Sequence, residues 1–536
     1  MRKPTLVFAL LVAVLIPATA GAHPERTTFF PDHTKGERPT FPTKGEILTV
    51  CKPDSAARVK RLWKGKGKKT SRTRRLRLRQ LKRCRFAHIQ AAVDAATSGD
   101  RIRIFPGVYR EEPSRAVTFN DPKCSKDDPK YWEETGDSHG EAGKVPTYLF
   151  HWECKNSRNL IQILGDSPED EDRECDQRCD LLIHGTGRRP EDVLIVGDRL
   201  KRDVLRADRA DGVYIKNLTT EQASFNGIDV VETNGFVVED VIGRYNQNYG
   251  ILTFTSDNGL YERAEGYGNG DSGLYPGSGP EGHCQRYGIE IRNSSSHDNV
   301  LGQSGTAGNG TWVHDSKWFN NGVGIVNDSF ASGHPGMPQD CSKWERNEVY
   351  SNNQNFFDEG NQQYCKDTPF KDRPREHVCP QFQSPVGTGF AFYGANANVI
   401  RNNRIWDNWR SGYTLFWVPA AVRGDDDPAA QRDTSHRNRI TQNVFGLDPD
   451  GKRSSNGVDV YWDEQGDGNC WEGNRGAGGK LDADPKSLPT CASGGSSGAT
   501  SKPEKIGPEI PCATWHPQDN PDPPGCTWFT TPPKPE

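Results

Sequence analysis

The residues able to do acid–base chemistry gather in one stretch of the chain. A lyase or epimerase acting on a uronic acid needs a cation to stabilise the enolate-like intermediate and a base to remove the proton beside the carboxylate. Arg292 or Arg263 could supply the cation. His283, His334 or Tyr275 could supply the base. The first chemistry that these residue types allow is therefore proton transfer on an acidic sugar.

The carboxylates of the same stretch allow a second chemistry. Hydrolysis of a glycosidic bond needs two carboxyl groups, one of them protonated, that flank the bond at roughly 5 to 9 Å. Asp328 and Glu290 are the candidates for this pair. The catalytic candidates of the two chemistries together are Glu290, Arg292, His283, Asp328 and His334.

Cationic and aromatic residues are the candidates for contacts with a polymer. They are Lys216, Arg263, His314, Tyr275, Phe254 and Trp312. Aromatic faces would give sugar rings flat platforms, and Arg or Lys would pair with carboxylates along the polymer. The competing interpretation is that polar and aromatic side chains on the outside of a sheet stabilise their neighbours through cross-strand contacts.

A repeat of short strand-like segments that begin with glycine must position these residues. One ladder begins at Gly212, Gly235, Gly259, Gly288 and Gly310, with spacings of 23, 24, 29 and 22 residues. A second ladder begins at Gly227, Gly250, Gly273, Gly302 and Gly324, and it follows the first by 14 or 15 residues throughout. Each repeat therefore holds two short strands in fixed phase, which predicts stacked coils that share one core. The expected fold is an all-β right-handed parallel β-helix.

Alternation along each strand predicts which side chains point outward, since successive residues face opposite sides. We take the residue after each glycine as inward. The outward set of the first ladder is then Lys216, Glu239, Arg263, Arg292 and His314, with Tyr214, Tyr261, Glu290 and Trp312 two places earlier. The outward set of the second ladder includes Asp229, Phe254, Tyr275 and Asp328.

Three insertions are predicted to leave one edge of the coils and to form a wall beside the outward residues. The first lies between Gly273 and Gly288 and contains His283. The second follows Asp328 and contains His334. The third follows Phe357 and contains a histidine and two cysteines. Functional residues concentrate in long loops on rigid scaffolds, so this edge is the candidate groove.

Residues 89–96 (IQAAVDAA) and 99–111 (GDRIRIFPGVYRE) resemble the opening of secreted β-helix proteins of the pectate-lyase-like superfamily. The resemblance implies a capping helix on the first coil, whose apolar side would be Ile89, Ala92, Val93 and Ala96. It covers roughly residues 45–475. The catalytic motifs of polygalacturonases and pectate lyases are absent from the sequence, so the resemblance implies the fold and no particular reaction.

Composition and targeting signals predict a secreted protein. The chain has 536 residues, a net charge of -4 and 33% hydrophobic residues, so no global field favours nucleic acid. Arg2 and Lys3 precede the apolar run from Leu6 to Ile16 and a small-residue stretch that ends at Ala22, which is typical of a signal peptide. No other segment has the length of a membrane span.

The fourteen cysteines predict disulfides between neighbours in the sequence, because an oxidising compartment preserves them. The pairs are Cys51 with Cys84, Cys124 with Cys154, Cys175 with Cys179, Cys284 with Cys341, Cys365 with Cys379, Cys470 with Cys491 and Cys512 with Cys526. Structural disulfides explain this pattern better than zinc ligation.

Four regions follow from these patterns. Residues 1–22 form the signal peptide, 23–44 an N-terminal extension, 45–480 the β-helix domain and 481–536 a Gly/Ser/Pro-rich tail, expected as an extended appendage. Residues 58–85 carry fifteen Lys/Arg and no acid, which indicates an exposed, disulfide-closed insertion, with a polyanion site as the alternative.

The function expected from the sequence is action on, or binding to, a polysaccharide. A lyase or epimerase of an acidic glycan comes first, a non-catalytic adhesion or matrix-binding protein second and a glycoside hydrolase third. The partner is a polysaccharide or another anionic cell-surface polymer, with no specific nucleic acid, and we expect a monomer. No cofactor follows with certainty; the acidic clusters Asp425–Asp427 and Asp463–Asp467 allow calcium, but solvated loops are the favoured explanation.

Overall fold

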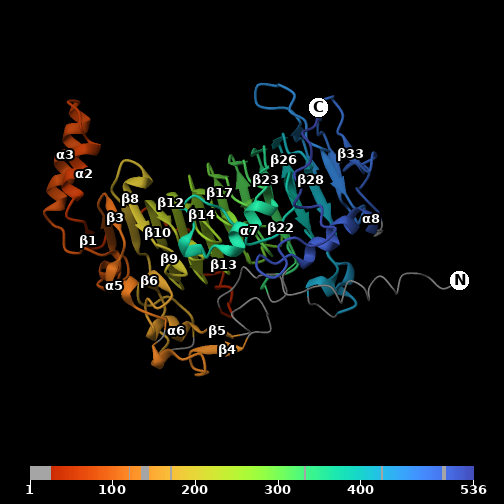
Figure 1. The fold of residues 1–536 in the computed structure, drawn as a ribbon. Helices are drawn as coiled ribbons and strands as arrows, with labels where there is room; N and C mark the ends of the chain where they lie inside the picture. Colours follow the sequence, from red (N-terminus) through yellow and green to blue (C-terminus); the bar gives the residue numbers. More distant parts are fainter. Residues whose placement is uncertain are drawn as a thin grey trace. The chain divides into compact units, whose positions relative to one another are not determined.

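The computed structural model describes residues 26–119, 121–134, 144–169, 172–330, 334–423, 427–497 and 502–536 (Figure 1). It contains two compact units, which we describe separately. The N-terminal unit comprises Arg26–Glu134 and Lys144–Tyr267, and the C-terminal unit comprises Gly268–Glu536. The predicted signal peptide lies outside the described residues. Among the described residues, no helix combines the length and apolar character needed to cross a bilayer.

The N-terminal unit has five helices and fifteen strands among its described residues. The helices are α2 (Ser55–Leu62), α3 (Lys68–Leu81), α4 (Ile89–Asp94), α5 (Glu112–Ala116) and α6 (Tyr148–Glu153). The strands are β1 (Ile47–Val50), β2 (Arg101–Ile104), β3 (Gly107–Tyr109), β4 (Trp132–Glu134), β5 (Lys144–Pro146), β6 (Asn159–Leu164), β7 (Leu182–Gly185), β8 (Val193–Val196), β9 (Asp203–Asp208), β10 (Val213–Glu221), β11 (Asn226–Val231), β12 (Asn234–Arg244), β13 (Ile251–Phe254), β14 (Asp257–Glu262) and β15 (Glu265–Tyr267).

The C-terminal unit also consists mainly of short strands. They are β16 (Ser272–Gly277), β17 (Ile289–Arg292), β18 (Ser295–His297), β19 (Leu301–Gln303), β20 (Thr311–His314), β21 (Lys317–Phe319), β22 (Val323–Asp328), β23 (Lys343–Glu345), β24 (Glu348–Tyr350), β25 (Thr388–Tyr393), β26 (Val399–Arg401), β27 (Arg404–Trp406), β28 (Ser411–Phe416), β29 (Arg439–Thr441), β30 (Val444–Phe445), β31 (Val460–Trp462), β32 (Cys470–Glu472) and β33 (Ala483–Asp484). Its helices are α7 (Glu359–Asp367) and α8 (Pro503–Ile506).

Equivalent strands of successive coils pair in parallel and in register. In the C-terminal unit Val313 lies beside Ile291, Trp344 beside Val313 and Ile400 beside Trp344, and all of these side chains are buried. Such columns of apolar residues form the continuous core that stacked coils share. The predicted fold, a right-handed parallel β-helix, is confirmed.

Each coil contains three strands, not the two that the glycine ladders predict. In the C-terminal unit one coil consists of β17, β18 and β19, and the next consists of β20, β21 and β22. The missed strand has only three residues in most coils and does not begin with glycine, so the glycine register does not mark it. In the N-terminal unit the first two strands merge into the long strands β10 and β12, which bend at Asn217 and Asp240 in the left-handed region (φ 55° and 53°).

The register of one coil in the N-terminal unit differs from the prediction by one residue. Asn258 (φ 51°) occupies the corner that glycine fills in the two preceding coils, and Gly259 lies beside the inward-facing Phe236. A Cβ atom on Gly259 would lie 2.1 Å from the ring of Phe236, so the glycine makes room for that ring. Leu260 therefore faces outward, and Tyr261, predicted outward, is completely buried.

Columns of asparagine hold the corners of the C-terminal unit together. One column consists of Asn269, Asn299, Asn321, Asn352, Asn408 and Asn456. Each side-chain amide donates to the carbonyl oxygen of the next asparagine at 2.9 to 3.2 Å. That oxygen also accepts a bond from a backbone N–H of the preceding coil. These bonds satisfy backbone groups that the turns leave without a ladder partner.

The C-terminal tail packs against the coils and is not the extended appendage that its composition predicts. Trp528 stacks on Tyr393 of β25 with ring centroids 5.8 Å apart, and Phe529 stacks on Phe357 at 4.4 Å. Trp515 lies in the same buried cluster. Because the tail covers the outside of the sheet that contains β22, β25 and β28, aromatic residues on that face are buried.

The cap and the disulfides agree with the sequence. Helix α4 buries Ile89, Ala92 and Val93, as expected of a cap on the first coil. All seven predicted pairings are present, and no described cysteine is free. The basic insertion forms the helical pair α2 and α3.

Candidate functional site

The outer sides of β17, β20, β23 and β26 in the C-terminal unit carry the largest group of predicted site residues. In register, Glu290 lies beside Trp312 and Trp312 beside Lys343. The neighbouring outward row runs from Arg292 through His314 and Glu345 to Arg401. We call this surface the charged face, comprising Glu290, Arg292, Trp312, His314, Lys343, Glu345 and Arg401.

His314 is held at the centre of the charged face by two carboxylates. Its Nε2 lies 3.1 Å from Glu290 Oε1, and its Nδ1 lies 2.6 Å from Asp315 Oδ2. Arg346 Nη2 lies 3.3 Å from the same Nδ1, so the imidazole is surrounded by groups of both signs. Arg292 Nη1 donates to the same Glu290 oxygen at 2.9 Å, and the Trp312 ring stacks on the imidazole at 4.3 Å. An arginine, a carboxylate and a histidine are thereby joined through one oxygen atom.

Glu345 anchors the other half of the charged face. Its side chain is only 3% exposed and accepts bonds from Trp312 Nε1 at 3.1 Å, Lys343 Nζ at 2.9 Å and Arg401 Nε at 2.7 Å. Burial alone would raise the pKa of Glu345, but the bonds from Lys343 and Arg401 outweigh it and lower that pKa to about 2. Glu345 is therefore ionised across the physiological range.

The arginine side chains lie nearer the surface than the carboxylates of Glu290 and Glu345. The side chains of Arg292, Arg346 and Arg401 are 37%, 46% and 44% exposed, whereas that of Glu290 is 9% exposed. Arg346 also bonds Asp315, and this bond, followed by the one from His314, lowers the pKa of that carboxyl to about 2. An anionic ligand approaching this face would meet guanidinium groups first, and these bind carboxylates through paired N–H donors.

Lys216 and Arg263 form a separate cluster in the N-terminal unit. Both bind Glu239, Lys216 at 2.5 Å, and Arg263 also bonds Asp240 at 2.6 Å. Tyr214 donates its hydroxyl to Glu239 as well. The two predicted cations therefore share one carboxylate, in a different unit from Arg292.

Phe254 and Tyr275 do not lie on an exposed surface, contrary to prediction. They are 2% and 1% exposed. The Tyr275 hydroxyl lies 3.3 Å from the backbone N–H of Thr306, in the loop that follows the next strand, and burial raises the pKa of Tyr275 well above its ordinary value. Both residues point out of the second sheet as alternation requires, but other segments cover them, so neither can be a platform for a sugar.

The carboxylate pair predicted for a hydrolase is not formed. Asp328 ends β22 of the second sheet, whereas Glu290 lies on β17 of the first. Asp328 is 2% exposed, and its Oδ1 accepts bonds from Thr306 Oγ1 at 2.9 Å and Phe330 N–H at 3.0 Å. The predicted base His334 is likewise buried, at 5% exposure. Both residues are therefore buried, and neither lies on the charged face.

Replacing Asp328 with Asn is expected to stabilise the protein at neutral pH. Burial raises the pKa of Asp328 to about 6, so the native state holds its proton more tightly than the unfolded chain. The free energy of unfolding therefore falls as the pH rises from about 4 to about 6. Above pH 6 it remains lower than at pH 4, by up to about 3 kcal/mol. The amide oxygen of Asn can accept both bonds that Oδ1 accepts now. Thermal melts should coincide near pH 4 and separate near pH 7.5, with D328N melting higher.

The exposed Asp372 supplies the control for this prediction. Because Asp372 lies in solvent, D372N should melt with the wild type at both pH values. Identical melting temperatures of D328N and wild-type protein near pH 7.5 would contradict the proposed titration.

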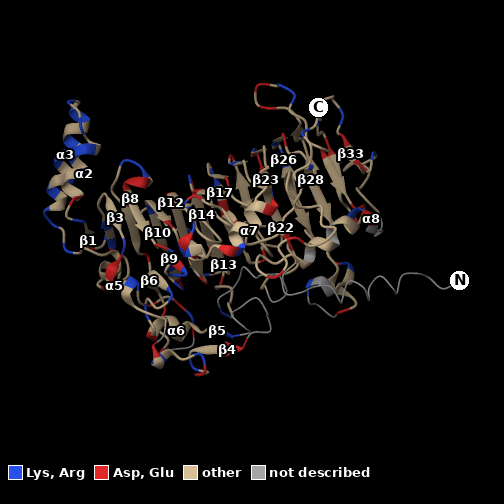
Figure 2. Cartoon of the chain, viewed as in Figure 1, with Lys and Arg blue, Asp and Glu red and all other residues tan. Residues whose placement is uncertain are grey.

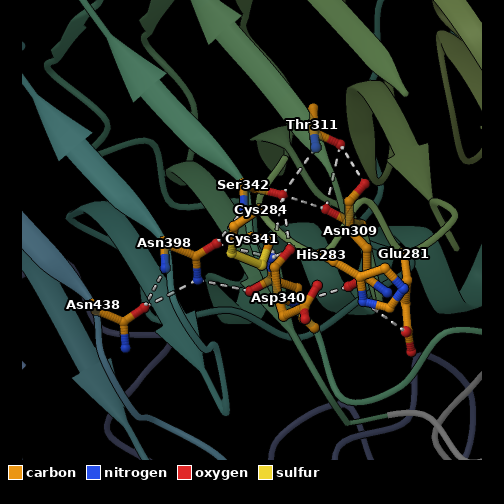
Figure 3. Close-up of a disulfide and its surroundings, with 12 residues drawn as sticks. Glu281, His283, Cys284, Asn309, Thr311, Asp340, Cys341, Ser342, Asn398 and Asn438 are labelled. Carbon is orange, nitrogen blue, oxygen red and sulfur yellow. Dashed lines mark hydrogen bonds and ion pairs between the residues drawn. A yellow bond between two sulfur atoms is a disulfide. The ribbon is translucent and has the colours of Figure 1, made fainter. Parts of the chain in front are cut away.

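The edge loops are cross-linked as predicted, but His283 does not reach the charged face. The Cys284–Cys341 disulfide joins the loops that follow β16 and β22 (Figure 3). Beside it, His283 is highly exposed and pairs with Glu281, with 3.8 Å between Nδ1 and Oε2. Tyr287, at the end of the first loop, contacts Trp312 with ring centroids 5.8 Å apart. The ring contact of Tyr287 with Trp312 thus joins the first edge loop to the charged face.

The third insertion leaves a different edge from the other two. It connects β24 to β25 and contains α7, whose Gln362 accepts a bond from Trp515 of the tail at 2.9 Å. The prediction placed all three insertions on one edge because it did not include the additional strand in each coil. The connection from β28 to β29 leaves the same edge as the first two.

An aromatic column on the missed strands escaped the sequence analysis. His297, Phe319, Tyr350 and Trp406 stack one above another, with centroids 4.8, 5.1 and 4.3 Å apart and nearly parallel rings. A repeated pattern of an aromatic residue, any residue and Asn could have revealed it. Because each ring covers the face of its neighbour, the column stabilises adjacent coils and offers few ring faces to a ligand.

The described residues contain one group with the spacing of metal ligands, and its chemistry does not fit. Cys365, His377 and Cys379 place their ligand atoms within 4.8 Å of one another, but the two cysteines form a disulfide and so have no thiolate to offer. For calcium, Asp425 and Asp426 lie outside the described residues. Asp463 accepts bonds from the backbone of Trp417 and Gln465, which explains its position without a cation.

Comparisons of the sequence find no matching family model and no matching curated protein. Solved structures with similar folds include the A-module of the Azotobacter vinelandii mannuronan C-5 epimerase AlgE4, which is 14% identical over 72% of this chain and 90% of that chain, with a TM-score of 0.39. They also include pectate lyase Pel9A, 12% identical over 82% of this chain and 79% of that chain, with a TM-score of 0.35. The strand topology of this chain is that of a parallel β-helix.

Proposed function

We propose that the protein is secreted, binds an acidic polysaccharide on the charged face and acts on it as a lyase or epimerase. The observation that carries the proposal is the junction of Arg292, Glu290 and His314 through one carboxylate oxygen, on the outer side of adjacent coils. The seven disulfides fit an oxidising compartment outside the cell. Coils stacked about 4.8 Å apart suit a linear polymer that crosses several of them.

Arg292 has the role of the electrophile in this proposal. Its exposed guanidinium would pair with the carboxylate of a uronate and stabilise the charge that develops there when the neighbouring proton leaves. His314 would be the proton-transfer group, because it is the titratable side chain bound to the carboxylate that Arg292 also binds. Glu290 would position both.

Non-catalytic attachment is the second candidate function. It is favoured by the state of the carboxylates on the charged face: Glu290, Asp315 and Glu345 are all engaged by cations of the same face. A surface of neutralised carboxylates under exposed arginines can hold a polyanion without any turnover.

Incubation with defined polysaccharides separates these functions. Polygalacturonate, alginate and a neutral glucan would be offered to the mature protein, with and without calcium. Ultraviolet absorbance reports unsaturated ends, reducing-end assays report all cleavage, and proton NMR reports inverted uronates. Unsaturated ends or inverted uronates from an acidic polymer alone are the expected result. Acidic polymers that bind without any product would establish attachment instead, and reducing ends without absorbance would establish hydrolysis.

A further inference from the structure

The basic insertion folds into a helical pair that we call the basic hairpin, residues 51–85. It contains α2 and α3 and is closed by the Cys51–Cys84 disulfide. Figure 2 shows α3 as a segment dominated by Lys and Arg. Fifteen basic residues and no acidic residue lie between positions 58 and 85. This density of one sign of charge on two short helices requires an explanation.

One side of the hairpin is fixed to the coils. Val59 and Trp63 are buried against Phe105, and Leu78 and Leu81 of α3 pack on the same cluster. The hairpin is therefore an ordered element, and two of the three leucines of α3 are occupied by this contact, while Leu76 is exposed.

The opposite side of α3 carries a straight row of cations, which we call the basic stripe. The stripe consists of Lys68, Arg72, Arg75, Arg79 and Lys82, all of them exposed. Successive members are four and three residues apart, so they lie on one side of the helix. At 1.5 Å per residue the stripe is about 21 Å long.

Nothing in the described structure neutralises the basic stripe. The described ion pairs of residues 58–85 join Arg58 to Asp54 and Arg85 to Glu46, and neither involves a stripe residue. Like charges three or four residues apart destabilise a helix, and lysines in its first turn oppose the helix dipole. Helix α3 begins with two lysines and has no acidic residue in its first turn. The stripe therefore lowers the stability of the helix that carries it.

The positive potential extends from α3 onto neighbouring strands. Arg103 of β2 lies beside His184 of β7 in register. Burial, followed by the charges of Arg77 on α3, Lys216 and Arg103, lowers the pKa of His184 to about 4. Burial and the charge of Arg103 also lower the pKa of Arg77. Positive charges of the hairpin and of β2 therefore act on the same residue, His184, against the opposing charge of Glu239.

We propose that the basic stripe is a binding site for a linear anionic polysaccharide, carboxylated or sulfated, distinct from the charged face. A row of cations on a rigid helix matches a polymer with regularly spaced anions. A membrane surface would need a continuous apolar side to insert, and apart from the single exposed Leu76 the leucines of α3 pack with Trp63 and Phe105. The seven disulfides place the protein in a compartment where polysaccharides are the more accessible polyanion.

The test compares two five-site variants of the full chain. The stripe variant changes Lys68, Arg72, Arg75, Arg79 and Lys82 to Gln. The control variant changes the exposed residues Lys366, Lys371, Lys452, Lys480 and Lys486 to Gln, so both variants lose the same charge. Titration calorimetry with heparin and with polygalacturonate, repeated at several salt concentrations, measures the affinity. Duplex DNA and phosphatidylserine vesicles serve as the other polyanions.

The stripe variant is expected to bind both glycans at least tenfold more weakly and with a shallower salt dependence, while the control variant binds as the wild type does. The melting temperature of the stripe variant should not fall, because the substitutions remove the repulsion between like charges on α3. Equal losses in both variants, or tighter wild-type binding to DNA or vesicles than to either glycan at the same salt, would overturn the proposal. Turnover of short oligosaccharides should be unchanged in the stripe variant, which separates this result from the proposed function of the charged face.

Discussion

Replacing Asn352 with Ala is expected to lower the free energy of unfolding by on the order of 5 kcal/mol. The Asn352 side chain accepts bonds from the backbone N–H and the side-chain amide of Asn321 at 3.2 and 3.0 Å, and donates to the Trp318 carbonyl at 3.2 Å. All three groups are buried, and each would lose this partner in N352A. Calorimetric melts at one scan rate measure the effect.

Lys317→Ala is the matched control for N352A. Lys317 lies on the adjacent strand, is exposed and forms an ion pair with Glu348 at 2.9 Å. Surface ion pairs contribute little, so K317A should cost less than about 1 kcal/mol. Hydrogen exchange adds a local readout, because the Asn321 amide should lose protection in N352A and keep it in K317A. Equal melting temperatures of the two variants would show that the column does not stabilise the coils.

Replacing Arg292 with Ala is expected to lower turnover of the acidic polymer at least about a hundredfold, with an unchanged melting temperature. Removal of one preorganised group that stabilises developing charge costs about 3 to 4 kcal/mol in the transition state. The Arg292 side chain is 37% exposed, and Glu290 keeps its contact with His314, so the packing of the coils should stay intact. Arg292→Lys should recover only part of the activity, because an ammonium group cannot reproduce the paired donors of a guanidinium.

Arg439→Ala is the control for R292A. Arg439 is an exposed arginine of β29, on the outer side of the same sheet but outside the charged face. The two variants lose the same charge, so a general electrostatic effect on the polymer would appear in both. Turnover in R292A equal to that in R439A would contradict the role given to Arg292.

The glycine repeat was sufficient to predict the architecture, for a physical reason. A coil of fixed length repeats the same backbone requirements. Glycine meets them at corners with positive φ in the first ladder, at Gly212, Gly235 and Gly310. In the second ladder it makes room for the neighbouring coil, because a Cβ atom on Gly302 would lie 2.4 Å from the Gly324 carbonyl oxygen. The same rule explains the failures. At Asn258 another residue adopts the left-handed conformation (φ 51°), so the neighbouring glycine shifts the expected register by one. The three-residue strands such as Ser295–His297 turn at Asn293 and Asp298, and the repeat of such corners has no glycine to mark it.

The candidate site could be predicted only where nothing covers the strand. Alternation correctly brings Glu290, Arg292 and His314 to the outer side of one sheet, where Arg292 is partly exposed and Glu290 and His314 lie beneath neighbouring side chains of that face. Alternation also predicts that Tyr275 and Asp328 point out of the second sheet, which contains β16 and β22. It does not predict that other segments bury both residues. A local pattern cannot identify a covering segment that comes from a distant part of the chain.

The covering tail has a consequence for how the chain acquires its structure during synthesis. Coils of a solenoid contact mainly their neighbours, so they can stack in order as they leave the ribosome. The sheet that contains Tyr393 and Phe416 is complete long before Trp515 and Trp528 are made. Until then a wide apolar surface of finished coils faces the surroundings, and such surfaces bind chaperones or one another. A chain interrupted before residue 515 would fold its coils and still be prone to aggregate.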